Sequence, residues 1–260
     1  MIRLGTSGFS YDDWVGPFYP KDLSKNQWLP YYAAEFDTVE LNVSYYRIPS
    51  RRMVEGWVAR TPDTFLFSVK AHRSITHDRK DQGFDQMQEA LEPLLESGKL
   101  GCILAQFPYS FHHNAENYEY LKLVRKEFWG LPLVIEFRNA RWVQERTFDF
   151  LKENDLGYCC VDEPKLRGLI PPAAAVTSSI GYVRFHGRNS EQWWEHEHAW
   201  QRYDYRYSEE ELEEWLPHFT KLKSAAPLTL VYANNHYKGK SVETQRTLQK
   251  ILVGEFGTLM

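Results

Sequence analysis

Short apolar runs alternate along the chain with longer segments of mixed apolar and polar positions. The runs have the length of strands, and most are apolar on both faces, as in a parallel sheet that is covered on both sides. This pattern predicts eight strands, at about residues 2–7, 38–42, 64–70, 100–106, 132–138, 158–162, 181–186 and 228–234.

Helical spacing and helix caps occupy most of the segments between these runs. Ser50 and Asn114 are candidate N-caps, and Ser208 with Glu211 forms a candidate capping box. The expected helices cover about residues 24–36, with an interruption at Pro30, then 50–60, a segment ending before Gly98, a segment capped by Asn114, 141–154, 208–223 and 241–253.

Two connections depart from this alternation. Residues 163–180 contain three prolines and no helical period, which predicts an irregular segment. A long polar and aromatic loop follows the seventh strand and reaches Ser208. Eight strand and helix units in about 250 residues are typical of a closed (β/α)8 barrel, so we expect one TIM-type barrel domain over residues 1–260. An open doubly wound sheet is the alternative, but Gly5-Thr-Ser-Gly8 lacks the spacing of a dinucleotide-binding loop.

Composition describes an ordinary globular chain. It has 260 residues, 43% of them hydrophobic and 25% charged, and a formal net charge of −4. That charge provides no general attraction to nucleic acid or to an anionic membrane. No apolar run approaches the roughly 18 residues of a membrane helix, and no signal peptide is evident, so we expect a cytoplasmic protein. The three cysteines lie in apolar runs and match neither a zinc site nor a disulfide framework.

Polar side chains gather where the predicted strands end. In the fifth strand Val134, Glu136 and Arg138 share one face, and the two charged residues close an otherwise apolar run. The same reading of the other strands adds Glu40, Asn42, Lys70, His72, Gln106, Asp162, Arg184, His186, Arg188, Asn234 and His236. Active sites of this fold lie at the carboxyl ends of the strands, which predicts a site there. A structural network in which these groups neutralise one another is the alternative.

The charges in this set indicate the chemistry of a ligand. Lys70, Arg138, Arg184 and Arg188 outnumber the carboxylates Glu40, Glu136 and Asp162, and arginine suits phosphate or carboxylate oxygens. We expect Glu40 or Asp162 to act as acid or base and Glu136 to orient its neighbours. Lys70 is expected to stabilise charge, or to act as a Schiff-base nucleophile if it is desolvated beside other cations.

The remaining candidates are expected to contact the ligand without reacting. They are Asn42, His72, Gln106, Trp142, His186, Asn234 and His236, together with Arg138, Arg184 and Arg188. Aromatic residues after strands one, two, five and seven either pack as loop cores or offer flat faces to a sugar or base. Cations interleaved with carboxylates disfavour a divalent ion, so we expect neither a metal nor another cofactor. His196 and His198 are an exception in spacing, but they fall in a polar loop.

Motifs in order along nearly the whole chain resemble the YecE-like family. They include Gly5-Thr-Ser-Gly8, Thr38-Val-Glu-Leu-Asn42, Phe67-Ser-Val-Lys-Ala71, Gln106-Phe-Pro108, Glu136-Phe-Arg138, Val161-Asp162, Arg184-Phe-His-Gly187 and Asn234-Asn-His236. The resemblance implies a TIM-type barrel and carries no established chemistry. It also implies that the matching strand-end residues are shared, whereas Tyr109, Asn139 and Ser241 depart from the family pattern.

Three functions fit these observations. The first is a metal-independent hydrolase, lyase or isomerase acting on a small anionic ligand with a ring, such as a sugar phosphate or nucleotide. The second is a barrel that binds nucleic acid or processes a phosphodiester, gripping the backbone with the same cations. The third is a sensor that binds a ligand and does not turn it over.

Overall fold

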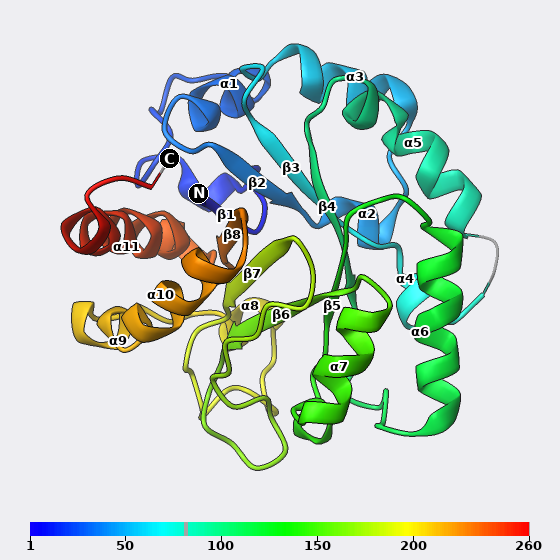
Figure 1. Cartoon of the computed structure of the whole chain (residues 1–260). Helices are drawn as coiled ribbons and strands as arrows, with labels where there is room; N and C mark the ends of the chain where they lie inside the picture. Colours follow the sequence, from blue (N-terminus) through cyan, green and yellow to red (C-terminus); the bar gives the residue numbers. More distant parts are fainter. Residues whose placement is uncertain (81–82, 260) are drawn as a thin grey trace.

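A computed structural model of the chain describes residues 1–80 and 83–259. Eight parallel strands form one nearly closed sheet in the order β1-β8-β7-β6-β5-β4-β3-β2, and helices surround it (Figure 1). The strands are β1 Ile2–Thr6, β2 Thr38–Leu41, β3 Leu66–Lys70, β4 Leu100–Gln106, β5 Leu133–Glu136, β6 Gly157–Asp162, β7 Ile180–Phe185 and β8 Leu228–Ala233. The predicted (β/α)8 barrel is confirmed, and each strand lies within the segment expected for it or extends one residue beyond it.

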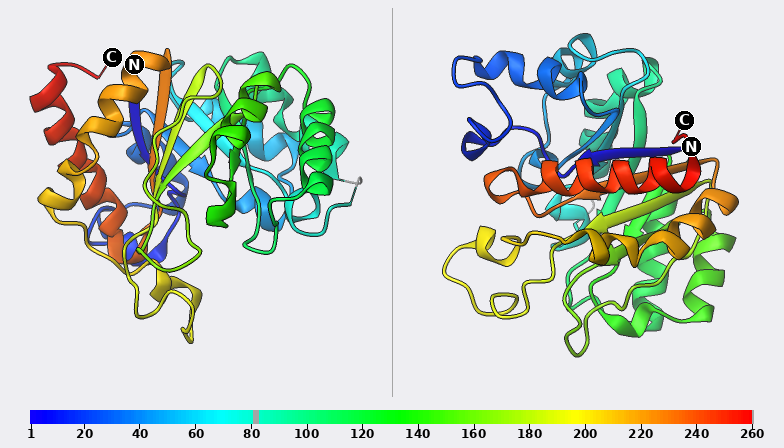
Figure 2. Two further views of the ribbon diagram at one scale, coloured as in Figure 1. Left: turned by 60° about the horizontal axis from the view of Figure 1, so that its bottom comes forward. Right: turned by 90° about the vertical axis from the view of Figure 1, so that its left-hand side faces the viewer.

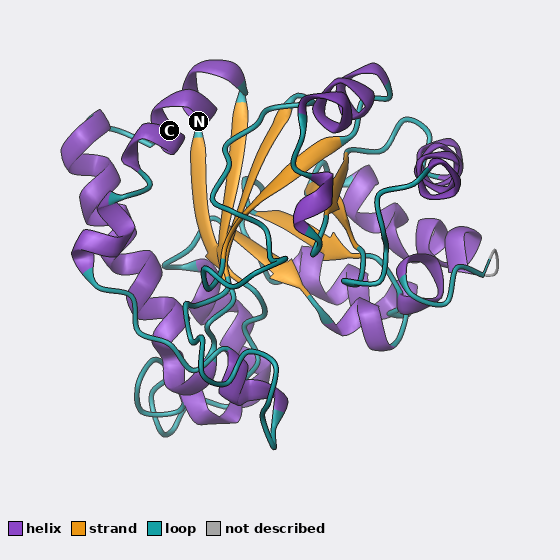
Figure 3. Cartoon of the chain, turned by 90° about the horizontal axis from the view of Figure 1, so that it is seen from below, coloured by secondary structure: helices purple, strands orange, loops and turns teal. Residues whose placement is uncertain are grey.

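The helices form an outer layer around these strands (Figure 3). They are α1 Trp28–Ala33, α2 Val43–Tyr46, α3 Arg51–Ala59, α4 Arg73–Thr76, α5 Phe84–Glu96, α6 Ala115–Glu127, α7 Glu145–Glu153, α8 Ala199–Arg202, α9 Glu209–Glu213, α10 Leu216–Ala225 and α11 Lys240–Phe256. Short 3₁₀ turns lie at Asp12–Trp14, Lys25–Gln27, Ala140–Trp142 and Tyr237–Gly239. Within the described chain, no helix has the length and apolarity that crossing a membrane requires.

Local sequence explains where several helices begin. The predicted caps are present, since Ser50 accepts from the Met53 amide and Asn114 accepts from the Asn117 amide. The capping box at Ser208 is also present, but the helix expected over 208–223 is two helices, α9 and α10. Pro217 lies in the first turn of α10, because a proline cannot donate the hydrogen bond that a continuous helix would need there.

The connection from β6 to β7 contains no helix, as its prolines predicted. The loop that follows β7 projects beyond the end of the barrel, with α8 inside it (yellow in Figure 2). Both long connections that the sequence set apart therefore emerge near the carboxyl ends of the strands, at the end of the barrel that we call the mouth.

Side chains fill the barrel interior below the mouth. The Tyr232 hydroxyl lies 2.6 Å from Thr38 Oγ1 and 2.8 Å from Ser68 Oγ, so this layer is polar but hydrogen-bonded. At Gly5 a Cβ atom would lie 2.0 Å from the carbonyl oxygen of Thr38, and only glycine lets β1 approach β2 so closely. The barrel closes where this contact is made.

Candidate functional site

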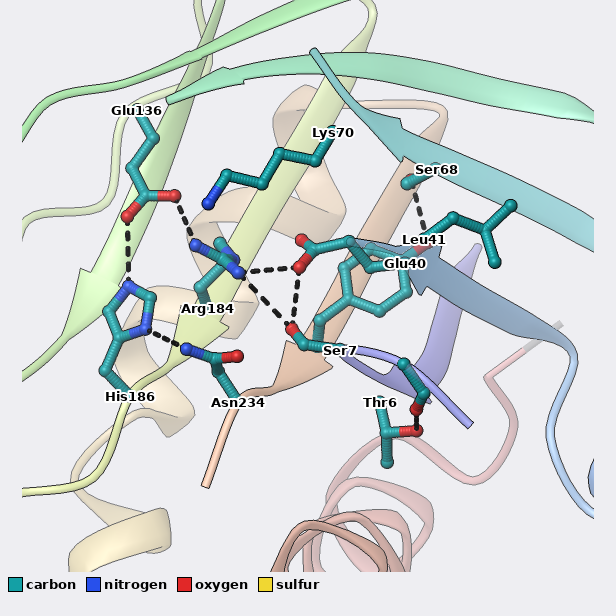
Figure 4. A network of polar contacts seen from close by, with 12 residues as sticks. Thr6, Ser7, Glu40, Leu41, Ser68, Lys70, Glu136, Arg184, His186 and Asn234 are labelled. Atoms are coloured by element: carbon teal, nitrogen blue, oxygen red, sulfur yellow. Dashed lines mark hydrogen bonds and ion pairs between the residues drawn. The ribbon is translucent and has the colours of Figure 1, made fainter. Parts of the chain in front are cut away.

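Arg184 lies at the centre of the mouth and is fully buried. Its Nη1 donates to Glu136 Oε2 and its Nη2 donates to Glu40 Oε1, both at 2.6 Å (Figure 4). The side chains come from β7, β5 and β2, so one guanidinium group joins three sectors of the barrel. The planar fork of arginine suits such a position because each side can bind a separate carboxylate.

The remaining carboxylate oxygens are occupied as well. Glu40 Oε1 also accepts from Ser7 Oγ at 2.7 Å, and Glu40 Oε2 accepts from the Tyr182 hydroxyl at 2.7 Å. Glu136 Oε1 lies 3.0 Å from His186 Nε2 and 2.8 Å from Arg138 Nε. Buried carboxylates surrounded by donors in this way are ion-pair partners.

The electrostatics of Glu136 and His186 agree with that interpretation. Burial alone would raise the pKa of Glu136, but Arg138 and Arg184 outweigh burial and hold this pKa well below its usual range. Burial and Arg138 hold the pKa of His186 well below its usual range, so its ring is neutral. Asn234 Nδ2 lies 3.1 Å from His186 Nδ1, which fits a tautomer that donates from Nε2 to Glu136.

These residues define what we call the inner network: Ser7, Glu40, Glu136, Tyr182, Arg184, His186 and Asn234. The sequence placed Glu40 as a base and Arg184 as a group that binds charge in a ligand. In the structure both oxygens of Glu40 and both terminal nitrogens of Arg184 have partners inside the protein, whereas Arg184 Nε has no hydrogen-bond partner among the described residues.

Asp162 lies outside this network, in contrast to the sequence interpretation. It accepts from the Tyr207 hydroxyl at 2.6 Å, from Trp215 Nε1 at 2.8 Å and from Arg188 Nη2 at 2.7 Å. Trp215 immediately precedes α10 on the outer layer, so the buried Asp162 and the partly exposed Arg188 form a separate cluster. The expected alternation along β6 was displaced by one residue.

Glu163, the residue after β6, is the carboxylate of this segment that contacts the charged groups of the mouth. The sequence interpretation missed it. Its Oε2 lies 3.4 Å from Arg138 Nη1, and its Oε1 accepts from the Ile170 amide at 2.8 Å. Burial raises the pKa of Glu163 to about 7, although Arg138 opposes this change. Cys159 on the same face of β6 is electrostatically coupled to Glu136 and Arg184, which the alternation of side chains explains.

Lys70 is the exception among the charged groups at the mouth. Its side chain extends toward Glu136 and Arg184 (Figure 4), and its Nζ lies 4.5 Å from the centre of the Tyr45 ring. Within the part of the chain that the structure describes, this Nζ forms no hydrogen bond or ion pair. Burial and Arg184 lower the pKa of Lys70 to about 7, and Glu136 opposes them.

A cavity of about 250 Å³ opens beside these groups, and we call it the rim cavity. Its lining combines strand ends with residues of the long loop after β7: His77, Gln106, Pro108, Tyr109, Arg138, Leu169, Trp193, Trp194, Arg202 and Tyr203. Two arginines and several aromatic rings line it, and no described lining residue is a carboxylate. A larger groove of about 590 Å³ lies between α6 and α7 on the outer layer, away from the strand ends.

The other predicted contact residues are dispersed. Gln106 lines the rim cavity, whereas Asn42 lines a separate apolar cavity of about 400 Å³ beside β1 and β2. His72 Nδ1 accepts from the Ser74 amide and caps α4, and the His236 ring stacks on Tyr11 with centroids 4.6 Å apart. None of these three, Asn42, His72 and His236, lines the rim cavity.

Trp142 is fully buried and does not reach the mouth as a ligand contact. Its Nε1 donates to the carbonyl oxygen of Phe111 at 2.7 Å, and its ring stacks on Phe137 with centroids 4.3 Å apart. Trp142 therefore packs in the core of its loop and does not line the rim cavity, which is a common position for an aromatic residue after a strand.

A nearly closed parallel barrel with ionisable side chains converging at its carboxyl end defines a TIM-type protein with a candidate site in the usual place. The chain belongs to the DUF72 family: the family model described as "Protein of unknown function DUF72" matches residues 3–258. The resemblance seen in the sequence is thereby confirmed at the level of this family, whose function is not established.

Known relatives extend over the whole chain. The UPF0759 protein YunF of Bacillus subtilis (strain 168) is 34% identical over 277 residues, which cover 100% of this chain and 97% of that protein. A crystal structure of a DUF72 family protein from Thermotoga maritima MSB8 has a TM-score of 0.89 at 40% identity, covering 97% of this chain and 99% of that one. One from Enterococcus faecalis V583 has a TM-score of 0.86 at 32% identity, covering 97% and 95%.

Proposed function

We propose that this protein is a metal-independent barrel enzyme that binds a small phosphorylated or carboxylated ligand in the rim cavity. The observation that carries the proposal is that Arg138 and Arg202 line one cavity that has aromatic walls and no described carboxylate. An anion in this cavity would meet the terminal nitrogens of Arg202 and the guanidinium group of Arg138, which is also paired with Glu136 and Glu163 behind the cavity wall.

Arg202 supports the proposal because only part of it is used within the protein. Its Nε donates to the carbonyl oxygen of Trp193 at 2.8 Å, and its guanidinium carbon lies 5.4 Å from the centre of the Trp193 ring. These two contacts orient the side chain. Its terminal nitrogens form no hydrogen bond or ion pair with any residue that the structure describes, so they are available to oxygen atoms of a ligand.

The size of the cavity narrows the ligand class. A volume of about 250 Å³ corresponds to roughly eight water molecules at ~30 Å³ each. Pockets for drug-sized ligands are larger, at about 300–1,000 Å³. Of the ligands that the sequence suggested, a short sugar phosphate fits this volume better than a nucleotide does.

A thermal-shift series tests the proposal. Inorganic phosphate, ribose 5-phosphate and unphosphorylated ribose are compared on the wild type, on Arg202→Met and on Arg206→Met. Arg206 is the matched control, since it lies on the same loop, is 67% exposed and pairs with Glu243 outside the cavity. A ligand at 100 times its Kd adds about 2.7 kcal/mol of stability.

We expect ribose 5-phosphate to stabilise the wild type and Arg206→Met, and to have little effect on Arg202→Met. Equal shifts in all three proteins, or none in the wild type, would overturn the anion site. A steep loss of binding with salt for short oligonucleotides would instead favour the nucleic-acid hypothesis. Stoichiometric binding without turnover of any ligand would favour a sensor.

A further inference from the structure

Two lysines of this chain, the buried Lys99 and the partly buried Lys70, differ in how their ammonium groups are satisfied. Lys99 Nζ donates to the carbonyl oxygens of Val58 at 2.9 Å and of Thr61 at 2.8 Å. This is how a structural lysine offsets the cost of leaving water. Lys70 Nζ has no such partner within the described chain and faces only the Tyr45 ring at close range.

The inner network is the reason that Lys70 lacks a partner. Glu40 and Glu136 point toward the same region, but donors from Ser7, Tyr182, Arg184 and His186 occupy their oxygens. The nearest charges that act on Lys70 are Arg184, Arg138, Glu136 and Glu40, and burial contributes more than any of them. The balance lowers the pKa of Lys70 to about 7, so about half of its amine is unprotonated near neutral pH.

The amine also lies close to the rim cavity. His77, which lines the cavity, contacts the Tyr45 ring with centroids 5.1 Å apart, and Lys70 Nζ lies against the same ring. Lys70 ends β3, while Gln106 ends the adjacent strand β4 and forms part of the cavity lining. Lys70 is not itself a lining residue of the cavity, but its amine lies beside the cavity, on the Tyr45 ring that His77 contacts.

We propose that Lys70 is a nucleophile that forms an imine with the carbonyl carbon of a short phosphorylated or carboxylated aldehyde or ketone. The inference rests on the proposed function, because Arg138 and Arg202 would hold the anionic end of that ligand. It names the reaction class of the site as that of a Schiff-base lyase or isomerase.

The step balances without an oxidant or a metal. The unprotonated Nζ forms a bond to the carbonyl carbon, and the C=O π pair moves to the oxygen, which takes a proton from the nitrogen. That hydroxyl takes one further proton from solvent and leaves as water, while the nitrogen lone pair forms the C=N bond of a protonated imine. The imine withdraws electrons from the adjacent carbon, so a C–H or C–C bond there can break. Addition of water then releases the product and restores the amine.

His77 is positioned to accept the proton that is released when the C–H bond next to the imine breaks. Burial and the charge of Lys70 lower the pKa of His77 to about 4, so its ring is neutral at pH 7. Thr76 Oγ1 lies 2.9 Å from His77 Nδ1, which leaves Nε2 as the nitrogen without a hydrogen bond among the described residues. A neutral imidazole facing the cavity can accept a proton, but a pKa of about 4 makes it a weak base.

Borohydride trapping tests the inference. The protein is incubated with glyceraldehyde 3-phosphate or with glyceraldehyde, reduced with sodium borohydride, and examined by intact mass and peptide mapping. The variants are Lys70→Met and Lys122→Met, because Lys122 is exposed and makes a surface ion pair with Glu119. Circular dichroism and urea unfolding of both variants check that the fold is retained.

We expect one adduct per chain, mapped to Lys70, in the wild type and in Lys122→Met. Lys70→Met should lose at least nine-tenths of it. The trapping rate should rise with pH through about 7 and then level off, whereas a surface lysine reacts faster up to about pH 10. Modification spread over surface lysines, with none at Lys70, would overturn the inference.

Comparison of the two aldehydes separates this inference from the proposed function. If ribose 5-phosphate stabilises the protein but no aldehyde is trapped at Lys70, the imine is wrong and the anion site stands. If both aldehydes are trapped equally at Lys70 and no anion stabilises the protein, the nucleophile stands and the anion site is wrong. Faster trapping of the phosphorylated aldehyde, abolished in Arg202→Met, would support both.

Discussion

The inner network and the rim cavity contain the same kinds of charged side chain, but they differ in how many of these side chains have partners inside the protein. In the inner network every carboxylate oxygen and both terminal nitrogens of Arg184 have partners inside the protein. In and beside the rim cavity, the terminal nitrogens of Arg202 and the amine of Lys70 have no hydrogen bond or ion pair among the described residues, whereas Arg138 is paired with Glu136 and Glu163. A charged residue at the mouth of a barrel therefore indicates chemistry only when its own partners leave it free.

Removal of Arg184 tests the structural side of this comparison and should have the largest effect. Arg184→Met leaves the buried Glu40 without its arginine partner and removes one of the two arginines paired with Glu136, so we expect a loss of about 3–5 kcal/mol in the free energy of unfolding. Urea denaturation measures it. Arg246→Met is the control, since its pair with Glu35 is partly exposed and should cost less than about 1 kcal/mol. Similar losses in the two variants would contradict the distinction.

Replacement of Lys70 should increase the free energy of unfolding, in contrast to replacement of Arg184. Because the folded pKa of about 7 lies below the ordinary value, the unfolded chain binds more protons between about pH 7 and 10. The protonated Lys70 amine thus destabilises the folded protein fully below pH 7. The stability of the wild type rises as the pH increases from about 7 to 10. With its partial contact with solvent taken into account, Lys70→Met should gain about 2–3 kcal/mol at pH 7.

Urea unfolding of the wild type and Lys70→Met at several pH values measures this gain. The advantage of the variant should shrink as the pH approaches 10. A variant less stable than the wild type at pH 7 would show that the ammonium group stabilises the fold, as Lys99 is expected to do, and would remove the contrast between the two lysines.

Glu163 gives a smaller effect of similar origin. Its folded pKa of about 7 lies above the ordinary value, so the folded protein binds more protons between about pH 4.5 and 7. The protonated Glu163 side chain therefore contributes to the stability of the folded protein at low pH, and this contribution is lost as the pH rises through 7. We compare the free energy of unfolding of Glu163→Gln with that of the wild type, measured in urea at pH 5 and at pH 8. The difference should shift in favour of the variant by about 1–2 kcal/mol from pH 5 to pH 8. An unchanged difference would mean that Arg138 keeps Glu163 ionised throughout.

The smallest expected effect concerns metal. Lys70, Arg138 and Arg184 repel a divalent ion, and the inner carboxylates are already paired. We expect a chelator to leave the melting temperature unchanged and dialysed protein to contain no stoichiometric metal. One equivalent of zinc, manganese or iron by elemental analysis would move the function toward metal-assisted hydrolysis or isomerisation.

The sequence predicted the barrel well because strands and helices have different periods along the whole chain. It also brought Glu136, Arg138, Arg184 and His186 together correctly, since their strands end in a polar side chain on one defined face. It failed at β6, where Tyr158 to Val161 are apolar on both faces and two adjacent carboxylates follow. Nothing in that run identifies which of the two carboxylates faces inward. The alternation therefore predicts Asp162 at the mouth, where the structure has Glu163.

The rim cavity could not be predicted from periodicity. His77 lies just after the short helix α4, and Trp193, Arg202 and Tyr203 belong to the long connection after β7. The positions of such residues depend on contacts made by the folded loop, as between Arg202 and Trp193. Whether a strand-end charge has a partner is likewise a property of the assembled barrel, so the sequence alone does not show that Glu40 is paired while the amine of Lys70 has no ion pair among the described residues.

The seam between β1 and β2 links assembly of the site to closure of the barrel. The paired strands run from β1 through β8 to β2, and the seam is bridged at Ser7 and Glu40, where the Gly8 amide donates to the Glu40 carbonyl at 2.7 Å. Glu40 therefore joins the ends of the sheet with its backbone and holds Arg184 with its side chain. A local opening of the sheet between β1 and β2 would therefore also displace the Glu40 side chain from Arg184. Separation of these two strands and loss of the ion pair at the mouth would occur together.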